Sequence, residues 1–378
     1  MSPGISVSKI PIPFFGGGGT DWDAYWASLI SATVENAAPT HVVMTFPAAE
    51  TLVATDLTAT VNGAARAVSS ASWTGAVWTA VLASAVVYGD VVVMTFVPSG
   101  GTAAVTNNVL DTRFKITVDT TKAGSADTHF VLPVTAKSAA SYFVDWGEGG
   151  AEEEFTTTGN KDHTYAASGT YQVKVRGGMT ALSFNNGGDK LKLMSIDNWG
   201  NIAWSSFNGA FWGCSNMVGT YLDNPNTSAV TNMYSMFNGC PLFNGHVSGF
   251  NTAAVTNMAY MFSACSVFNQ SVANFNTAKV ANMNNMFRNC PAFKQSLATF
   301  SLDAATNIGE MLVGSTNINA TGTTTNYDAT LVAWAAADVP NSLSFNGGTS
   351  KYSLGTGAAA RQSLIDDDLW TIADGGLL

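Results

Sequence analysis

The four cysteines are the first residues whose type and spacing could do chemistry, because thiolates bind metals and thiols pair into disulfides. Cys240, Cys265 and Cys290 follow one another at intervals of 25 residues, and Cys214 precedes them by 26. No Cys-x-x-Cys pair and no histidine at metal-ligand spacing accompanies them. One cysteine at the same place in each of several equal segments predicts a column of buried free thiols, which Ser315 continues.

A second group with chemical capacity is acidic. Asp145, Glu148, Glu152, Glu153 and Glu154 lie close together in the sequence, and carboxylate oxygens are the ligands that calcium prefers. No Asp-x-Asp-x-Asp-Gly loop is present. A solvated acidic loop is therefore favoured, and a calcium site near Asp145 is left open.

Catalytic residues are scarce in the second half of the chain. Residues 226–302 contain no Asp or Glu, although paired carboxylates for glycoside hydrolysis could come from distant segments. His246 is the only histidine after residue 163, and no Gly-x-Ser-x-Gly segment accompanies it. The sequence thus predicts no catalytic residue, no metal and no cofactor, with a polysaccharide-degrading enzyme kept as an alternative.

A repeated segment must position these residues. The pattern Val-x-Asn-Met-x-x-Met-Phe-x-x-Cys begins at Val230, Val255 and Val280, and weaker copies occupy residues 207–214 and 307–315. A fixed period of about 20–29 residues is typical of leucine-rich-type solenoids, in which stacked coils share one core.

Each copy has a local interpretation. Met233, Met236 and Phe237 have the i, i+3, i+4 spacing of one helix face, which predicts a short helix capped by Thr231 or Asn232. The alternation over residues 243–247 predicts a strand. The asparagines at one position of each copy are expected to satisfy backbone groups in the turn between coils: Asn232, Asn257, Asn282 and Asn307.

The pattern Val-Thr-Asn-Met-x-x-Met-Phe-x-x-Cys-x-x-Phe-Asn resembles the BspA-type leucine-rich repeats of bacterial and phage surface proteins. The resemblance covers roughly residues 183–378 and implies a solenoid. Residues 192–200 resemble its entry coil. Residues 327–334 and 358–370 are predicted to form amphipathic helices, with a strand near 342–345. Residues 347–353 (GGTSKYS) and 370–376 (WTIADGG) resemble the C-terminal cap of the same surface proteins.

Two further modules precede the repeats. Short strand-like runs over 41–46, 57–61, 73–82 and 91–96, with a turn at Asn62-Gly63, indicate an immunoglobulin-like (Ig-like) sandwich. Residues 142–149 (YFVDWGEG) and 163–175 (HTYAASGTYQVKV) resemble the paired signatures of polycystic-kidney-disease-type (PKD-like) domains. Such domains are usually non-catalytic spacers.

The predicted fold is mainly β and multidomain, with two β-sandwich modules followed by a leucine-rich-type solenoid of 25-residue repeats and a C-terminal cap. The predicted domains are an N-terminal docking arm (1–33), an Ig-like β-sandwich (34–112), a PKD-like β-sandwich (113–182), a BspA-type solenoid (183–325) and a C-terminal cap (326–378).

The composition of the chain excludes two classes of binding partner. The chain has 378 residues, of which 46% are hydrophobic and 11% charged, and its net charge is −10 with 16 Lys+Arg. Nucleic acid is not expected, because phosphate binding needs clustered basic residues. No apolar run of about 18 residues appears, so membrane insertion is not expected either.

The N-terminal segment is rich in Pro and Gly, which predicts an extended conformation, and it lacks the apolar stretch of a secretory signal. A disordered leader followed by a helix packed on the next domain fits this pattern, and so does an arm that becomes ordered on other virion proteins, which is the interpretation we adopt. Its apolar side chains are the predicted docking residues: Ile10, Ile12, Phe14 and Phe15.

A polar strip on the repeats is the predicted ligand surface. Alternation over residues 243–247 buries Phe243 and Val247 and leaves the residues between them facing outward. Amides and hydroxyls of this kind bind glycans or protein surfaces, although a merely solvated face fits the same pattern. The predicted strip comprises Asn244, His246, Asn269, Ser271, Lys294 and Ser296.

Together these features predict a non-enzymatic virion structural protein, a phage fibre or a capsid or tail decoration, located on the virion surface. Its repeats would attach to a host surface protein or glycan. A secreted adhesin on the bacterial cell surface is the first alternative, and a homo-oligomer is left open.

Overall fold

The computed structural model of the protein describes residues 29–35, 38–46, 55, 57–86, 91–97, 100–108, 111–315 and 326–378. The chain divides into two compact units, residues 1–111 and 112–378. The predicted class is confirmed, since the structure is mainly β, with 34% strand and 7% helix in several sheets. The predicted docking residues lie outside the described residues: Ile10, Ile12, Phe14 and Phe15.

The described residues of the first unit form an eight-stranded sheet in the order β4-β3-β7-β8-β1-β2-β6-β5, antiparallel except for the β1–β8 pair. Their bounds are β1 Ser31–Glu35, β2 His41–Thr45, β3 Leu57–Val61, β4 Ala64–Arg66, β5 Val68–Thr74, β6 Val77–Leu82, β7 Val92–Phe96 and β8 Gly101–Asn108.

Alternating burial in these strands builds one core. Inward residues of β2, β3, β6 and β7 pack together, and Phe46 lies 5.0 Å from Trp78 between ring centroids. Asn62 and Gly63 both have positive φ, 52° and 78°, as a tight hairpin turn requires. The single run predicted over 73–82 is instead a hairpin, because Gly75 (φ 61°) turns the chain between β5 and β6.

The second unit begins with a seven-stranded sheet in the order β11-β10-β13-β9-β14-β15, with β12 also paired to β10. Its strands are β9 Phe114–Asp119, β10 His129–Asp145, β11 Glu153–Phe155, β12 Gly159–Thr164, β13 Thr170–Leu182, β14 Leu193–Asn198 and β15 Val218–Gly219.

Strand β14 joins this sheet to the repeats. It pairs antiparallel with β9 and parallel with β15, and one hydrophobic core runs without a break from Phe114 to Trp370. Lys192 is fully buried beside the joint, and its Nζ donates hydrogen bonds of 2.8–3.0 Å to the carbonyls of Ser125, Ala126 and His129. The region 112–182 and the repeats are thus built around a continuous core.

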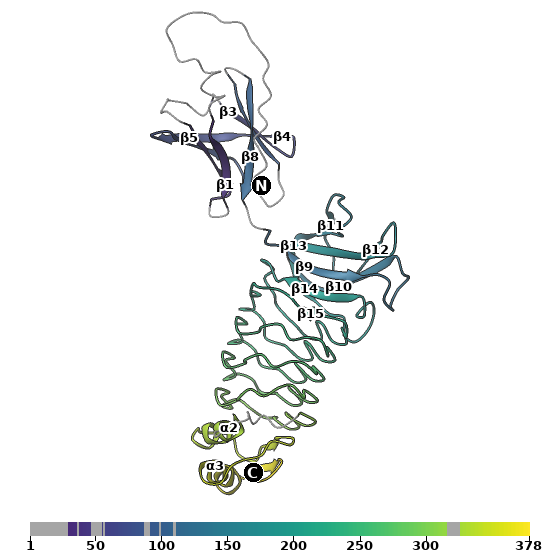
Figure 1. Ribbon diagram of the computed structural model, residues 1–378, viewed down its shortest axis with the longest axis vertical. Coiled ribbons are helices and arrows are strands. Elements are labelled where there is room, and N and C mark those ends of the chain that lie inside the picture. Colours follow the sequence, from purple (N-terminus) through teal and green to yellow (C-terminus); the bar gives the residue numbers. More distant parts are fainter. Residues whose placement is uncertain are drawn as a thin grey trace, which may run out of the picture. The chain divides into compact units, whose positions relative to one another are not determined.

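Figure 1 shows the coils stacked between β15 and α2, and backbone hydrogen bonds join each coil to the next. In the coil of Met233, the N–H groups of residues 233, 235, 237 and 239 donate to carbonyls of the following coil. The same four positions of the neighbouring coils repeat this pattern, with distances of 2.7–3.1 Å from Phe207 to Asn289. Parallel bridges also join Asn232, Asn257, Asn282 and Asn307 in sequence.

The local conformation of a coil differs from the prediction. Residues 233–239 form consecutive turns and no helix, because Ser235 (φ 52°) and Gly239 (φ 71°) are left-handed. A helix would point every N–H along its own axis, whereas these turns direct alternate N–H groups to the next coil. The strand predicted over 243–247 is also absent, and that segment has no regular secondary structure.

Side chains of the coils form continuous rows in the core. Each coil stacks two phenylalanines at 3.9–4.1 Å between centroids, in the pairs Phe237–Phe243, Phe262–Phe268 and Phe287–Phe293. Equivalent rings of successive coils lie 5.7–6.1 Å apart. The predicted burial of the repeated Met, Phe and Cys residues is confirmed.

The C-terminal elements cover the last coil and include both predicted helices and the predicted strand, although the second helix ends at Asp366 and not at residue 370. Helix α2 spans Asn326–Ala335, β16 Ser344–Asn346, α3 Thr356–Asp366 and β17 Thr371–Ala373. Strand β16 pairs with β17, and Phe345 forms a bridge with Ile308 of the last coil. The Leu312 N–H donates to the Asn346 carbonyl at 3.1 Å, which continues the ladder of the repeats into the cap.

Replacing Phe262 by Ala tests the stacked core. The ring is fully buried and contacts Phe237, Phe268 and Phe287. Its loss is expected to lower the free energy of unfolding by about 3–5 kcal/mol, through lost transfer energy and a residual cavity. Denaturant unfolding followed by circular dichroism measures the change. The exposed Val267→Ala is the control, and equal stability of both variants would contradict the packing.

Candidate binding surface of the repeats

The predicted strip contains two asparagines that bond between coils. The Asn244 Oδ1 accepts the Asn269 N–H at 3.0 Å, and the Asn269 Oδ1 accepts the Lys294 N–H at 2.9 Å. Gln270 and Gln295 add side-chain bonds to the same asparagines. Both asparagines are exposed, but their oxygens hold adjacent coils together, so their replacement would cost about 0.5–1.5 kcal/mol each.

The other strip residues differ in accessibility. Lys294 and Ser271 are exposed, whereas Ser296 lies 3.5 Å from the Thr330 hydroxyl of α2. The half-buried His246 ring packs at 4.9 Å from Tyr221. The accessible groups are therefore the Lys294 ammonium, the Ser271 hydroxyl, the asparagine NH₂ groups and part of the imidazole.

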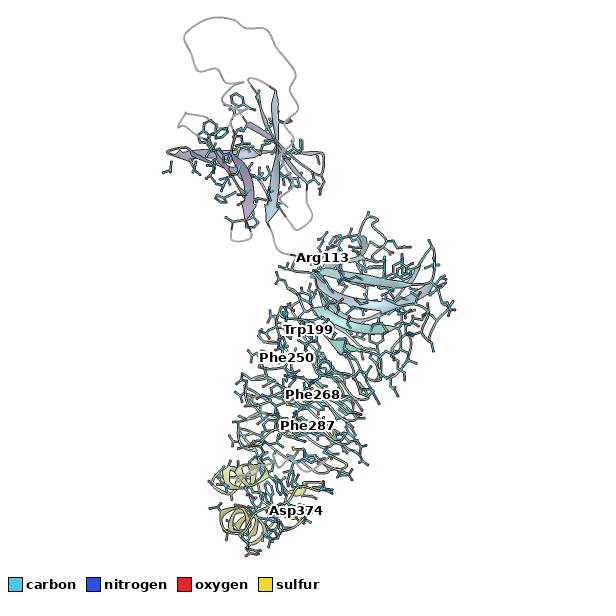
Figure 2. All side chains as sticks on the ribbon, viewed as in Figure 1. Arg113, Trp199, Phe250, Phe268, Phe287 and Asp374 are labelled. Carbon is cyan, nitrogen blue, oxygen red and sulfur yellow. The ribbon has the colours of Figure 1, made fainter. Side chains whose placement is uncertain are left out.

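The cysteines form the predicted buried column of free thiols. The Sγ atoms of Cys240 and Cys265 each donate at 3.0 Å to a carbonyl of the preceding coil, and Cys290 does so at 2.7 Å. Ser315 continues the column through its bond to the Phe287 carbonyl. Burial raises the pKa of all four thiols, that of Cys290 to about 12. Figure 2 shows the side chains that fill the stack around Phe268 and Phe287.

Asparagines also close the corners of the coils, as predicted. The side-chain oxygens of Asn232, Asn257 and Asn282 each accept the N–H two residues on, at 2.9–3.0 Å. A second column does the same at another corner, through Asn251 and Asn276 at 3.1 Å. These amides satisfy backbone N–H groups of the turns, which is a structural role.

The acidic group near Asp145 has protein partners. Asp145 pairs with Arg113 and Lys174, and Glu152 pairs with Arg113 and Arg176. The Ala166 N–H and the His163 ring bond Glu148 and lower its pKa. Within the described ranges, no three His, Cys, Asp or Glu side chains are grouped as metal ligands.

Sequence reasoning missed two tyrosines on the coils. Tyr234 and Tyr260 are partly exposed and contact each other, with ring centroids 5.8 Å apart at an interplanar angle of 67°. The sequence did contain a signal for these tyrosines, because both differ in type from the equivalent residues of the other repeats. Tyr260 occupies the place of Ser235 and Asn285, and Tyr234 that of Ala259 and Asn284, as their matched backbone bonds show.

Comparison with known proteins gives a family match for the repeats. Residues 205–327, a third of the chain, match the family model described as Mycoplasma protein of unknown function, DUF285. This family is related to the BspA-type repeats and is often found in surface proteins. No curated protein and no solved structure matches the chain. None of the helices in the described part has the length and apolarity needed to cross a bilayer.

The burial of the thiol column predicts that the cysteines do not react with thiol reagents in the native protein. Ellman's reagent should label none of the four cysteines in the native protein and all four after unfolding, because the thiols are buried and protonated. An added exposed thiol, Ser266→Cys, should react at once and serves as the control. Rapid native labelling of Cys265 would contradict the packing.

The same thiols predict a dependence of stability on pH. The pKa of Cys290 rises on folding from its ordinary 9.0 to about 12. The buried thiol's contribution to the free energy of unfolding is therefore fully present below pH 9. It is lost as the pH rises toward 12, because the Cys290 thiol ionises at lower pH in the unfolded chain than in the folded protein. Urea unfolding of Cys290→Ser should lose less stability across this window than the wild-type protein does.

Proposed function

We propose that the chain is a non-enzymatic structural protein of a phage virion, a fibre or decoration, that displays an adhesive solenoid to the host surface. The region 183–325 would be a BspA-type leucine-rich solenoid, preceded by an Ig-like module and a PKD-like module. One observation carries the attachment function, namely the rigid stack of coils with polar, nearly uncharged outer segments. The match of residues 205–327 to a family often found in surface proteins supports display.

The chemistry of the strip favours binding. Residues 226–302 contain no Asp or Glu, so the central coils lack a carboxylate that could act as a general acid or base. Neutral hydrogen bonds contribute about 0.5–1.5 kcal/mol each, so useful attachment requires many copies on one particle. Binding should depend little on salt, because few charges take part.

A bacterial surface adhesin is the second candidate. The matched family model is described from Mycoplasma, which favours a cellular origin for this type of repeat. The two candidates share the adhesive solenoid and differ in what anchors the other end. In the virion proposal, the arm 1–33 docks on other virion proteins.

Attachment is tested with strip residues whose side chains form no hydrogen bonds between coils. The double variant His246→Ala, Lys294→Ala should fold normally and reduce binding of labelled protein to host bacteria several-fold, because accessible polar contacts are lost. Lys279→Ala, another exposed lysine on the coils, is the matched control. Flow cytometry measures binding. Undiminished attachment of the double variant would show that the strip is only a solvated surface.

The virion assignment has its own test. Deleting residues 1–20 should prevent incorporation into particles while leaving the melting curve unchanged, because the arm would be needed only for docking. Mass spectrometry of purified particles measures incorporation. Normal incorporation of the truncated chain would contradict docking through the arm. Release of sugar fragments by the purified protein would instead favour the polysaccharide-degrading alternative.

A further inference from the structure

Tyr234 and Tyr260 have unused binding capacity. Both rings are only half-buried, and neither hydroxyl has a hydrogen-bond partner among the residues that the structure describes. Tyrosine joins an apolar ring to a polar tip, which is why it is enriched in binding surfaces. The pair thus presents two aromatic faces and two free hydroxyls on adjacent coils.

The backbone of Tyr260 is unfavourable for its residue type. Its φ is 59°, and the equivalent residues Gly209, Ser235, Asn285 and Glu310 have φ of 50–60°. A bulky aromatic residue is uncommon in this left-handed region. The ladder between coils imposes this conformation on every copy, so the unusual feature of Tyr260 is its aromatic residue type.

Free amides flank the tyrosines. Asn208 and Asn284 occupy the position of Tyr234 in the preceding coil and two coils later, as the aligned backbone bonds show. In the described part of the chain, neither side-chain amide has a hydrogen-bond partner, in contrast to the corner asparagine Asn257. Hydrogen-bonding groups therefore lie on both sides of the aromatic pair, along the direction of stacking.

We propose that Tyr234, Tyr260, Asn208 and Asn284 form a binding site for a neutral oligosaccharide that runs along the stack. The apolar face of a sugar ring would pack on the tyrosines, and its hydroxyls would bond the amides and phenols. This inference rests on the proposed attachment function and assigns glycan contact to residues outside the strip.

The local charges favour a neutral ligand. No Asp or Glu occurs over 226–302 to bind a cationic ligand. Arg288 is engaged, since it donates to the Asn285 side chain at 3.0 Å and pairs with Glu310. The Arg288 guanidinium is therefore not free to pair with the carboxylate of an acidic sugar. Successive coils are about 4.8 Å apart along the stack. The four proposed binding residues lie on four successive coils, so the site extends over three coil spacings.

The test separates binding from folding. The full chain is applied to a printed array of neutral hexose and N-acetylhexosamine oligosaccharides, and saturation-transfer NMR measures affinity for the glycans that bind. Tyr260→Gly should weaken binding about tenfold or more while its melting temperature stays equal or rises, because glycine adopts φ 59° freely. Asn208→Ala and Asn284→Ala should each weaken binding without unfolding.

Ala264→Gly is the matched control. Ala264 lies in the same coil with the same φ of 59° and has no polar side chain, so the variant should be stabilised and bind normally. Wild-type affinity of Tyr260→Gly would overturn the inference. So would the absence of any bound neutral glycan on the array. If cell attachment still depended on His246 and Lys294, the proposed function would stand while this site failed, and a protein ligand would be indicated.

Discussion

The backbone hydrogen bonds between coils are the interaction on which the rest of the second unit depends. Every other N–H over residues 233–239 points to the following coil, and each partner carbonyl lies one repeat further on. This arrangement requires left-handed residues at two places in each coil. It also leaves corners where the chain must turn without a helix or a hairpin, and the asparagine side chains satisfy the backbone there.

Such a ladder must be closed at both ends, since unpaired buried N–H and carbonyl groups are costly. At the first coil, the N–H groups of Phe184, Asn185 and Asn186 donate to carbonyls of residues 209–212. At the last coil, Asn346 accepts the Leu312 N–H. The strands before the repeats and the α/β elements after them therefore complete the stack, which explains the shared core.

The sequence was sufficient to predict what the period alone determines. Equal spacing identified the buried Met, Phe and Cys residues and the role of Asn232. It could not distinguish a helix from consecutive turns, because the i, i+3, i+4 spacing of Met233, Met236 and Phe237 suits both. The left-handed positions were hidden for another reason, since Ser235, Tyr260, Asn285 and Glu310 share no residue type.

The strip shows a second limit of the sequence. Alternation predicted correctly that Asn244 and Asn269 are exposed. Whether their oxygens are free depends on the backbone of the adjacent coil, 25 residues away, and no local pattern encodes that contact. Tyr234 and Tyr260 were missed because a consensus of the repeats averages away the positions at which single copies depart from it.

The identical junctions between coils make the stack modular. Each coil donates the same backbone N–H groups to the following coil and accepts with the same carbonyls from the preceding one. A whole 25-residue unit can therefore be duplicated or lost while the elements that cover the two ends of the stack keep their hydrogen-bond partners. Recombination within the gene could then change the reach of the protein in steps of about 4.8 Å. Surface features such as the tyrosine pair would be moved along the stack without any redesign of its interior.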